Sequence, residues 1–572
     1  MQRNCVNLVL AALLVVAFSA CNKNLGALSA EYFKVNPAVL ENVGGRVNAG
    51  ITTGIPAGYF DKKSILTITP VLLASTGEEW RGESASFQGE QVKDNYTVVP
   101  FETGAVVSQQ VSFGFDPSMR QSELYLEFTV QRGKKTSQLP RIKVADGVLS
   151  TVSLADPAAL TPQWSEDSFQ RIIQDKQEAS ILFLIQQSNI RDSQLKTDEM
   201  QSFVQRLSRA SWEQNQQISR LEVLGYASPE GPKALNARLA EERERNAMNF
   251  INRELQKIKE NPAVDSKFTA EDWAGFQALM EQSNIQDKEL ILRVLSMYSD
   301  SEEREREIRN LSQAFTQIAD EILPQLRRSR LNVTVDIIGK SDEEILSLLK
   351  SNPKSLSIEE ILYAARLLRG TASLDDQFAV YQQISEWQPD DYRAFNNMGV
   401  VRFLQQNFTD AGKYFKRAAA VDNSAPEIHY NTGLIALING NISEAETAFG
   451  QAVGTGEALN EALGVMYMMK GNFPQAESIM RQAPNTNNVA LSKILMGDYD
   501  RAGEVLDLVQ MPDATTYYMK AIAGARSNSK DEVYKGMRAA IMRDKSKAGY
   551  ALKDVEFAKY LSDPAFMSIV KQ

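Results

Sequence analysis

The chain has 572 residues, 43% hydrophobic and 23% charged, so it is long enough for several globular domains and is not disordered. Its formal net charge of −10 argues against a nucleic-acid partner, because binding to phosphates requires a basic face. The single histidine, His429, confines any Ser-His-Asp triad or histidine zinc site to its own neighbourhood. We therefore expect no enzymatic activity, no cofactor and no metal site, although composition leaves a paired-carboxylate hydrolase open.

The first 20 residues predict a signal peptide. Arg3 supplies a short positive region, and the apolar run that follows is too short for a comfortable membrane span. The run ends in Phe18-Ser19-Ala20-Cys21, which resembles a bacterial lipoprotein cleavage site. On this interpretation Cys21 becomes the first residue and carries acyl chains that anchor the protein. The alternative is a plain secretory signal with an incidental cysteine.

Lipidation of Cys21 has two consequences. Because Cys5 lies inside the signal peptide, the mature chain would contain no disulfide and no free thiol. Residues 21–30 would form a short tether without an acidic run. We therefore expect a lipid-anchored protein on the periplasmic side of the outer membrane.

Residues 31–156 predict a β-sandwich domain. The stretch SELYLEFTV, Ser122 to Val130, alternates between apolar and polar residues, as a half-buried strand does. Ser64 to Ala74 and Asn95 to Phe101 are rich in β-branched and aromatic residues, and glycine turn signals recur between such runs. No site chemistry is evident in this region.

Residues 163–340 predict an α/β domain. A short apolar strand, Ile218 to Val223, precedes the loop Gly225-Tyr226-Ala227-Ser228-Pro229-Glu230-Gly231, in which Gly225, Pro229 and Gly231 are expected to break regular structure. The helix after the loop carries Asn236, Leu239, Ala240 and Arg243. This pattern resembles the OmpA-type C-terminal domain, which binds peptidoglycan without a covalent bond. Upstream, residues 178–195 resemble the first strand and turn of that family, and residues 326–339 resemble its closing strand.

The resemblance implies a site for the peptide stem of peptidoglycan. In the family, a loop aspartate binds the ammonium of diaminopimelate and a helix arginine binds its carboxylate. Arg243 falls at the arginine position, where we expect a solvated side chain directed at the loop, but Ser228 stands at the aspartate position and brings no charge. Glu230 is a candidate for the missing carboxylate. Muropeptide binding and a vestigial fold kept for interactions therefore both stay open.

Between the second helix and the last strand, residues 256–325 predict a charged helical insert. Glu302 to Glu307 alternate in charge, which is typical of a solvated helix face and less often of an interaction tail.

Residues 355–572 predict an all-α tetratricopeptide repeat solenoid. A turn followed by an alanine recurs near Ala411, Ala445, Ala476 and Ala502, and Gly433 is expected where two helix backbones meet. Stacked helix pairs of this kind present a concave surface for a protein partner.

These elements lead to two main functional hypotheses. In the first, a periplasm-facing outer-membrane lipoprotein attaches to peptidoglycan through the OmpA-like domain and scaffolds protein partners through its repeats. In the alternative, it is a scaffold subunit of an outer-membrane assembly or secretion complex that does not bind glycan. A glycan-cleaving enzyme is a third hypothesis, without a supporting motif.

Overall fold

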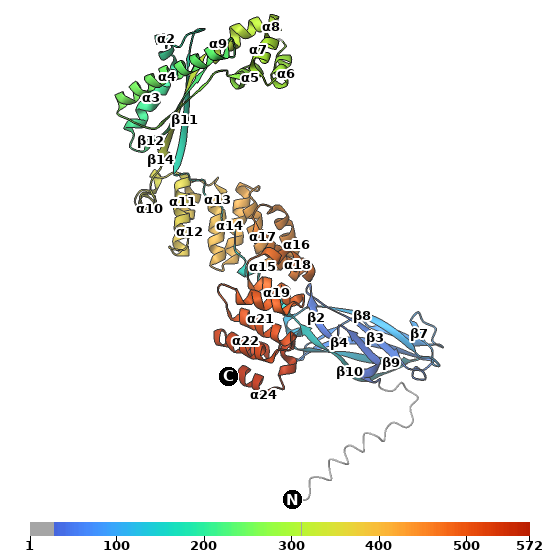
Figure 1. Ribbon diagram of the computed structural model, residues 1–572. Coiled ribbons are helices and arrows are strands. Elements are labelled where there is room, and N and C mark those ends of the chain that lie inside the picture. Colours follow the sequence, from blue (N-terminus) through green and yellow to red (C-terminus); the bar gives the residue numbers. More distant parts are fainter. Residues whose placement is uncertain (1–27, 286, 311, 572) are drawn as a thin grey trace, which may run out of the picture. The chain divides into compact units, whose positions relative to one another are not determined.

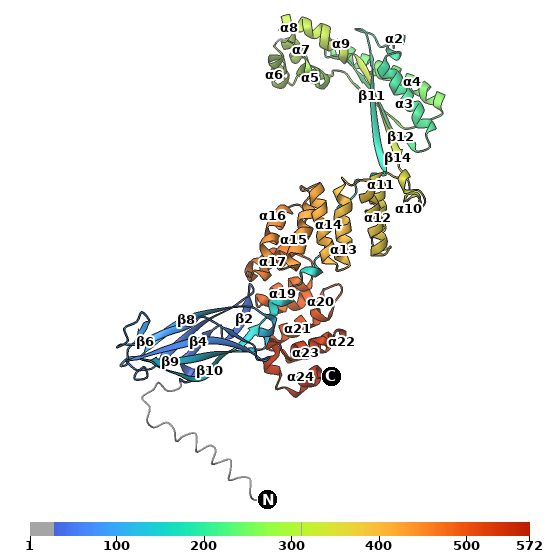
Figure 2. The same ribbon diagram turned by 180° about the vertical axis from the view of Figure 1, so that it is seen from behind.

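The computed structural model describes residues 28–285, 287–310 and 312–571, so the predicted signal peptide and Cys21 lie outside the described residues. Figures 1 and 2 show the chain from opposite sides. It divides into two compact units, of which the first contains the residues up to Ser165 and those from Gly370 on, and the second contains Glu166–Arg369. A multidomain chain with a strand-rich N-terminal region and C-terminal helical repeats is therefore confirmed.

The strand-rich region of the first unit consists of two packed β-layers. One layer contains β1, β3 and β8, the other has the order β10-β9-β4-β6-β7, and β2 pairs with both β3 and β10. The predicted alternation of Ser122 to Val130 is confirmed, because every second residue from Leu124 on is buried between the layers. The strands are β1 (Phe33–Asn36), β2 (Val39–Val43), β3 (Arg46–Ile55), β4 (Ser64–Ala74), β5 (Glu79–Arg81), β6 (Ala85–Gly89), β7 (Thr97–Val99), β8 (Ala105–Gly114), β9 (Ser122–Arg132) and β10 (Lys135–Leu149).

The second unit contains a four-stranded sheet with the order β11-β14-β12-β13. Two long helices cover one face, and apolar residues from both share a core with the strands. The elements are β11 (Ile172–Leu182), α2 (Asp192–Leu195), α3 (Asp198–Trp212), β12 (Gln216–Tyr226), α4 (Lys233–Ile258), β13 (Val264–Thr269) and β14 (Arg328–Ile338), followed by α10 (Asp342–Ser351) and α11 (Ile358–Leu367).

Gly225 does not break the strand as expected, because β12 continues to Tyr226. A Cβ atom at Gly225 would lie 2.3 Å from the carbonyl oxygen of Ala240, so the glycine lets α4 approach the strand closely. Gly231 does turn the chain, since its φ of +81° is in the left-handed region.

The predicted helical insert begins with a strand instead. β13 pairs in parallel with β12, with Leu221 opposite Val264. This strand was missed because its side chains are mostly exposed and carry no apolar alternation. The rest of the insert packs around its own apolar core. Its helices are α5 (Trp273–Gln282), α6 (Lys288–Met297), α7 (Ser301–Asn310), α8 (Ser312–Gln317) and α9 (Leu323–Leu326).

The C-terminal part of the first unit is a stack of antiparallel helix pairs, in which each pair forms one repeat (Figure 1). After α12 (Leu374–Trp387) the pairs are α13 (Tyr392–Leu404) with α14 (Phe408–Val421), α15 (Pro426–Ile438) with α16 (Ile442–Gln451), α17 (Glu457–Met469) with α18 (Phe473–Ile479), α19 (Asn487–Leu495) with α20 (Tyr499–Asp507), and α21 (Ala514–Arg526) with α22 (Lys530–Arg543). The stack ends with α23 (Ser546–Ala551) and α24 (Pro564–Val570).

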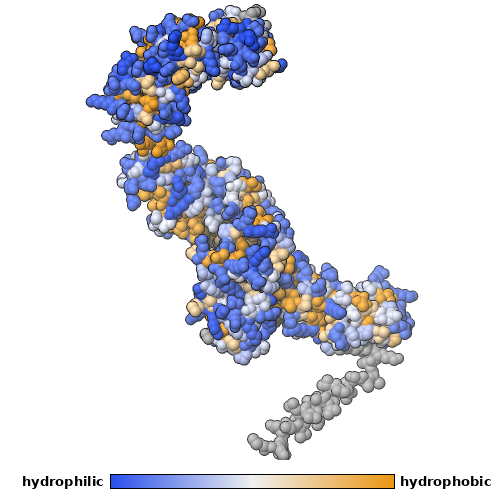
Figure 3. All heavy atoms as spheres, in the orientation of Figure 1, coloured by the Kyte–Doolittle hydropathy of each residue, from blue (hydrophilic) through white to orange (hydrophobic). Residues whose placement is uncertain are grey.

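In the view of Figure 3, hydrophilic residues cover most of the visible surface of the repeats and of the α/β domain. Within residues 28–285, 287–310 and 312–571, no helix combines the length and the apolar character needed to span a bilayer.

Candidate functional site

The first helices of several repeats carry asparagines that bond the main chain of residues 150–165, the linker that leaves the strand-rich region. Asn397 of α13 accepts a hydrogen bond from the Ser165 N–H at 2.8 Å and donates one to the Ser165 carbonyl oxygen at 2.9 Å. One carboxamide thus satisfies both main-chain groups of one linker residue.

The same arrangement occurs at two further linker residues. Asn431 of α15 accepts from the Gln163 N–H at 2.8 Å and donates to its carbonyl oxygen at 2.7 Å. Asn488 of α19 accepts from the Asp156 N–H at 2.9 Å and donates to its carbonyl oxygen at 3.0 Å. Since three repeats bond the linker identically, the contact is a property of the repeat geometry.

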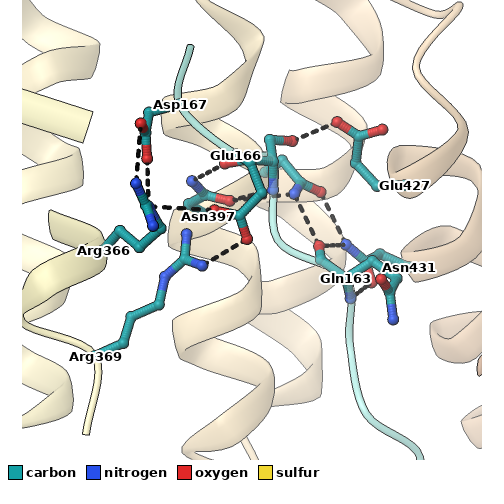
Figure 4. Close-up of polar contacts among 10 residues, drawn as sticks. Gln163, Glu166, Asp167, Arg366, Arg369, Asn397, Glu427 and Asn431 are labelled. Atoms are coloured by element: carbon teal, nitrogen blue, oxygen red, sulfur yellow. Dashed lines mark hydrogen bonds and ion pairs between the residues drawn. The ribbon is translucent and has the colours of Figure 1, made fainter. Parts of the chain in front are cut away.

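A fourth asparagine, Asn396, adds to the contact between Gln163 and Asn431, whose two labelled residues Figure 4 shows. Asn396 donates to the Gln163 carbonyl oxygen at 3.1 Å and accepts from the Asn431 carboxamide at 2.9 Å. We call these four residues, Asn396, Asn397, Asn431 and Asn488, the asparagine face. All four are buried. Because a buried carboxamide without partners is destabilising by about 1–3 kcal/mol, the linker stabilises the face that holds it.

Apolar side chains of the linker extend these polar contacts. Val152 and Leu160 are buried in the same core as the repeat helices. The ring of Trp164 lies 5.9 Å from that of Tyr381 on α12. The linker is therefore held by the repeats through apolar packing as well as through hydrogen bonds.

The start of the linker is held by a buried ion pair. Arg526 of α21 contacts Glu556 at 2.6 Å, and Thr151 donates a hydrogen bond to the same carboxylate. Arg526 also donates to the Thr151 hydroxyl at 3.2 Å. Thr151 thus connects the end of the strand-rich region to the last repeats.

α17 contributes an acid to this region. Glu461 accepts a hydrogen bond from the Thr486 hydroxyl at 2.6 Å. Burial raises the pKa of Glu461, and hydrogen bonds from Thr486 and Asn488 act in the opposite direction. The folded protein therefore gives up the proton of Glu461 at a higher pH than the unfolded chain does.

The residues after the linker belong to the second unit and pair there with arginines. Asp167 contacts Arg366 at 2.6 Å, and Glu166 contacts Arg369 at 2.7 Å, as Figure 4 also shows. The Ser168 N–H donates to Glu359 at 2.6 Å. α11 and the turn that follows it thus bond Glu166, Asp167 and Ser168, the residues that come directly after the linker.

A cavity of about 990 Å³ lies in the first unit between the strands and the last helices. Three charged groups on its wall already have protein partners: Glu123 contacts Lys143, Asp554 accepts from Tyr518, and Lys559 donates to Asn528. These three charged groups are therefore satisfied within the protein.

In the α/β domain, Ser228, Glu230 and Arg243 line one pocket of about 170 Å³ together with residues of the loop and of α4. Ser228 donates to Glu230 at 3.0 Å, and Glu230 forms an ion pair with Arg327 at 2.7 Å. The Gly231 N–H donates to Glu305 of the insert at 2.8 Å. The three predicted residues lie together, but Ser228 bonds Glu230, and Glu230 is already paired with Arg327.

Arg243 is not the solvated side chain that we expected, because only 1% of it is exposed. Its guanidinium donates to the carbonyl oxygens of Gln187 and Tyr226 at 3.0 and 2.9 Å and lies 5.1 Å from the Phe183 ring. Burial lowers the pKa of Arg243 to about 10, so it stays charged at neutral pH. In this structure Arg243 holds the loops around the pocket.

His429 is half-buried on α15, and its Nε2 lies 2.8 Å from the carbonyl oxygen of Asn423. Within the described ranges, no cluster of three or more His, Cys, Asp or Glu could hold a metal ion.

The sequence analysis did not predict the asparagine face. Its signal was an asparagine two residues before a glycine in successive repeats, at Asn397 and Asn431.

Comparison with known proteins identifies the repeats. Residues 405–457 match the family model of the tetratricopeptide repeat. No curated protein matches the chain at a significant level. The chain therefore contains tetratricopeptide repeats, which suggest a protein–protein interaction scaffold.

Several solved structures are similar. A tetratricopeptide repeat protein from Parabacteroides merdae has 13% identity over 47% of this chain and 98% of that one, with a TM-score of 0.30. Pseudomonas aeruginosa pilF has 14% identity over 40% and 98%, with a TM-score of 0.27. YrrB, a repeat protein with an unusual peptide-binding site, has 16% identity over 36% and 94%, with a TM-score of 0.22. Since these scores are below 0.5, the assignment rests on the family model and on the helix pairs.

Proposed function

We propose that this protein is a non-enzymatic scaffold of the bacterial cell envelope, anchored by acyl chains on Cys21 to the periplasmic side of the outer membrane. The repeats hold a protein partner, and the α/β domain of the OmpA type serves as an interaction module. This corresponds to a scaffold subunit of an outer-membrane assembly or secretion complex.

One observation carries the choice of a scaffold over peptidoglycan attachment, namely the internal pairing of the pocket around Ser228. Recognition of a diaminopimelate zwitterion needs one available group of each sign. Here the carboxylate of Glu230 is paired with Arg327, and Arg243 donates to main-chain carbonyl oxygens. A ligand would have to replace these bonds before it gained any of its own.

Site-specific photo-cross-linking in intact cells tests the scaffold. A photoreactive amino acid is placed at one exposed position in each domain: Val106, Trp212 or Met511, which are 76%, 78% and 88% exposed. We expect the repeat position, Met511, to give a discrete adduct with one envelope protein. If Met511 and other exposed repeat positions give no adduct while the other domains do, the repeats are not the scaffold surface.

Peptidoglycan attachment is a second candidate, because the three residues named by the family resemblance do line one pocket. Sedimentation of the purified full chain with sacculi distinguishes the two. Attachment requires that the wild type sediments and that Glu230→Gln abolishes this, whereas Glu302→Gln, an exposed change on α7, leaves it intact. The scaffold proposal expects all three proteins in the supernatant.

A further inference from the structure

The asparagine face contacts the linker through main-chain groups. At Gln163, both the N–H and the carbonyl oxygen bond to asparagines. The same holds for Ser165 and Asp156. Such contacts require an available N–H and carbonyl oxygen at the contacted residue, and they place little demand on the side chain at that position.

The linker should bind the asparagine face more strongly than a separate peptide would. It is covalently joined to the strand-rich region, whose end is held by Thr151 against Glu556. Tethering makes its binding intramolecular, with an effective concentration that a free peptide rarely reaches. A competitor would also have to displace Val152 and Leu160 from the repeat core.

We propose that the asparagine face is a site for a peptide main chain and that the linker of the same chain is its built-in ligand. The linker keeps other peptides out, and a protein partner of the repeats binds outside this face. This inference goes beyond the proposed function, because the linker fills the site whether or not a partner exists.

A pair of substitutions at Gln163 tests the role of the main chain in the full-length protein. Gln163→Pro removes the N–H that donates to Asn431, whereas Gln163→Ala keeps every main-chain bond. Hydrogen exchange followed by mass spectrometry measures protection of peptides that cover residues 150–169. We expect slow exchange in the wild type and Gln163→Ala, and at least tenfold faster exchange in Gln163→Pro.

A second pair changes the repeat side. Asn431→Ala removes the carboxamide that bonds both main-chain groups of Gln163. Asn439→Ala is the control, because it changes an exposed asparagine at the end of the same helix. We expect only Asn431→Ala to open the linker to limited proteolysis, while the strand-rich region stays resistant. If Asn431→Ala unfolds the repeats altogether, the comparison of Gln163→Pro with Gln163→Ala still tests the proposal.

A competition experiment tests whether the linker keeps an added peptide from binding to the asparagine face. A labelled synthetic peptide of residues 150–169 is added in molar excess to the wild-type chain, and uptake is measured by fluorescence anisotropy. We expect no stoichiometric binding. Uptake by the wild type, exchange of the linker at the rate of an unfolded peptide, or equal exchange in Gln163→Pro and Gln163→Ala would each overturn the proposal. None of these results depends on a partner or on peptidoglycan.

Discussion

The ring of Phe449 occupies the space that a side chain at Gly433 would need. A Cβ atom built on Gly433 would lie 2.4 Å from Cε1 of Phe449. The sequence predicted a requirement for a small residue here but attributed it to two helix backbones, whereas the close neighbour is an aromatic ring of α16. The same relationship joins Gly399 to Phe415 one repeat earlier.

Gly433→Ala should therefore lower the free energy of unfolding by about 1–3 kcal/mol through overpacking. The matched control is Gly450→Ala on α16, where a Cβ atom meets nothing within 4 Å. That change should be neutral or should stabilise by up to about 1 kcal/mol, because alanine favours helix. Thermal denaturation of the two variants checks the assignment, and equal effects would contradict it.

Arg243→Ala should destabilise the α/β domain by about 3 kcal/mol, because it removes a buried side chain together with its bonds to two loop carbonyl oxygens. Arg245→Ala is the control on the same helix. Its side chain is 63% exposed and pairs with Glu241 on the helix surface, so we expect a change of about 0.5 kcal/mol or less. Chemical denaturation of both variants measures the difference. A small effect of Arg243→Ala would restore the solvated, ligand-binding interpretation.

Ser228→Asp places a second carboxylate beside Glu230 in a buried position. We expect a lower melting temperature, because Arg327 cannot neutralise both acids. Adding Glu230→Gln to the same chain should recover most of the loss, since a single carboxylate remains. The coupling between the two substitutions, obtained from a double-mutant cycle, is the quantity to measure. Additive effects would mean that the two side chains do not meet.

Glu461 should make stability depend on pH. Burial raises its folded-state pKa above the ordinary value of 4.5, so the folded chain keeps a proton that the unfolded chain has lost. Stability from this group therefore falls as the pH rises from 4.5 through the folded pKa. Glu461→Gln should be more stable than the wild type above this window and similar below it. Melting curves across pH, with the exposed Glu444→Gln as control, check the sign.

Cys21→Ser should release the protein from the outer membrane or leave it unprocessed at the inner membrane, because the acyl chains are the proposed anchor. Membrane fractionation and the mass of the N-terminal peptide provide the measurement. Full processing of the serine variant together with retention in the outer-membrane fraction would exclude lipidation as the anchor.

Much of the fold was predictable because local patterns and tertiary structure agree. The alternation around Leu124 and the glycine positions of the repeats follow from burial on one face. β13 was not predictable, since an exposed edge strand has no apolar pattern and its pairing with β12 depends on contacts distant in sequence.

The candidate site was only partly predictable. The family resemblance brought Ser228, Glu230 and Arg243 to one pocket, but it gave no information on Arg327 or Glu305, which pair with the loop from distant parts of the chain. Predicting the asparagine face from the sequence would require knowing which segment binds to it. A buried asparagine in a repeat indicates a polar partner, but the sequence does not say which segment provides it.

The separation of the linker from its contacts has a consequence for synthesis. Gln163 bonds a residue 268 positions later, and Asp156 bonds one 332 positions later. The linker therefore leaves the ribosome before any helix that holds it, and the whole of Glu166–Arg369 is made in between. Until α15 and α19 are made, Val152 and Leu160 lack the helices that bury them. Secretion in an unfolded state, followed by folding of the entire chain, would therefore suit this protein better than domain-by-domain folding during translation.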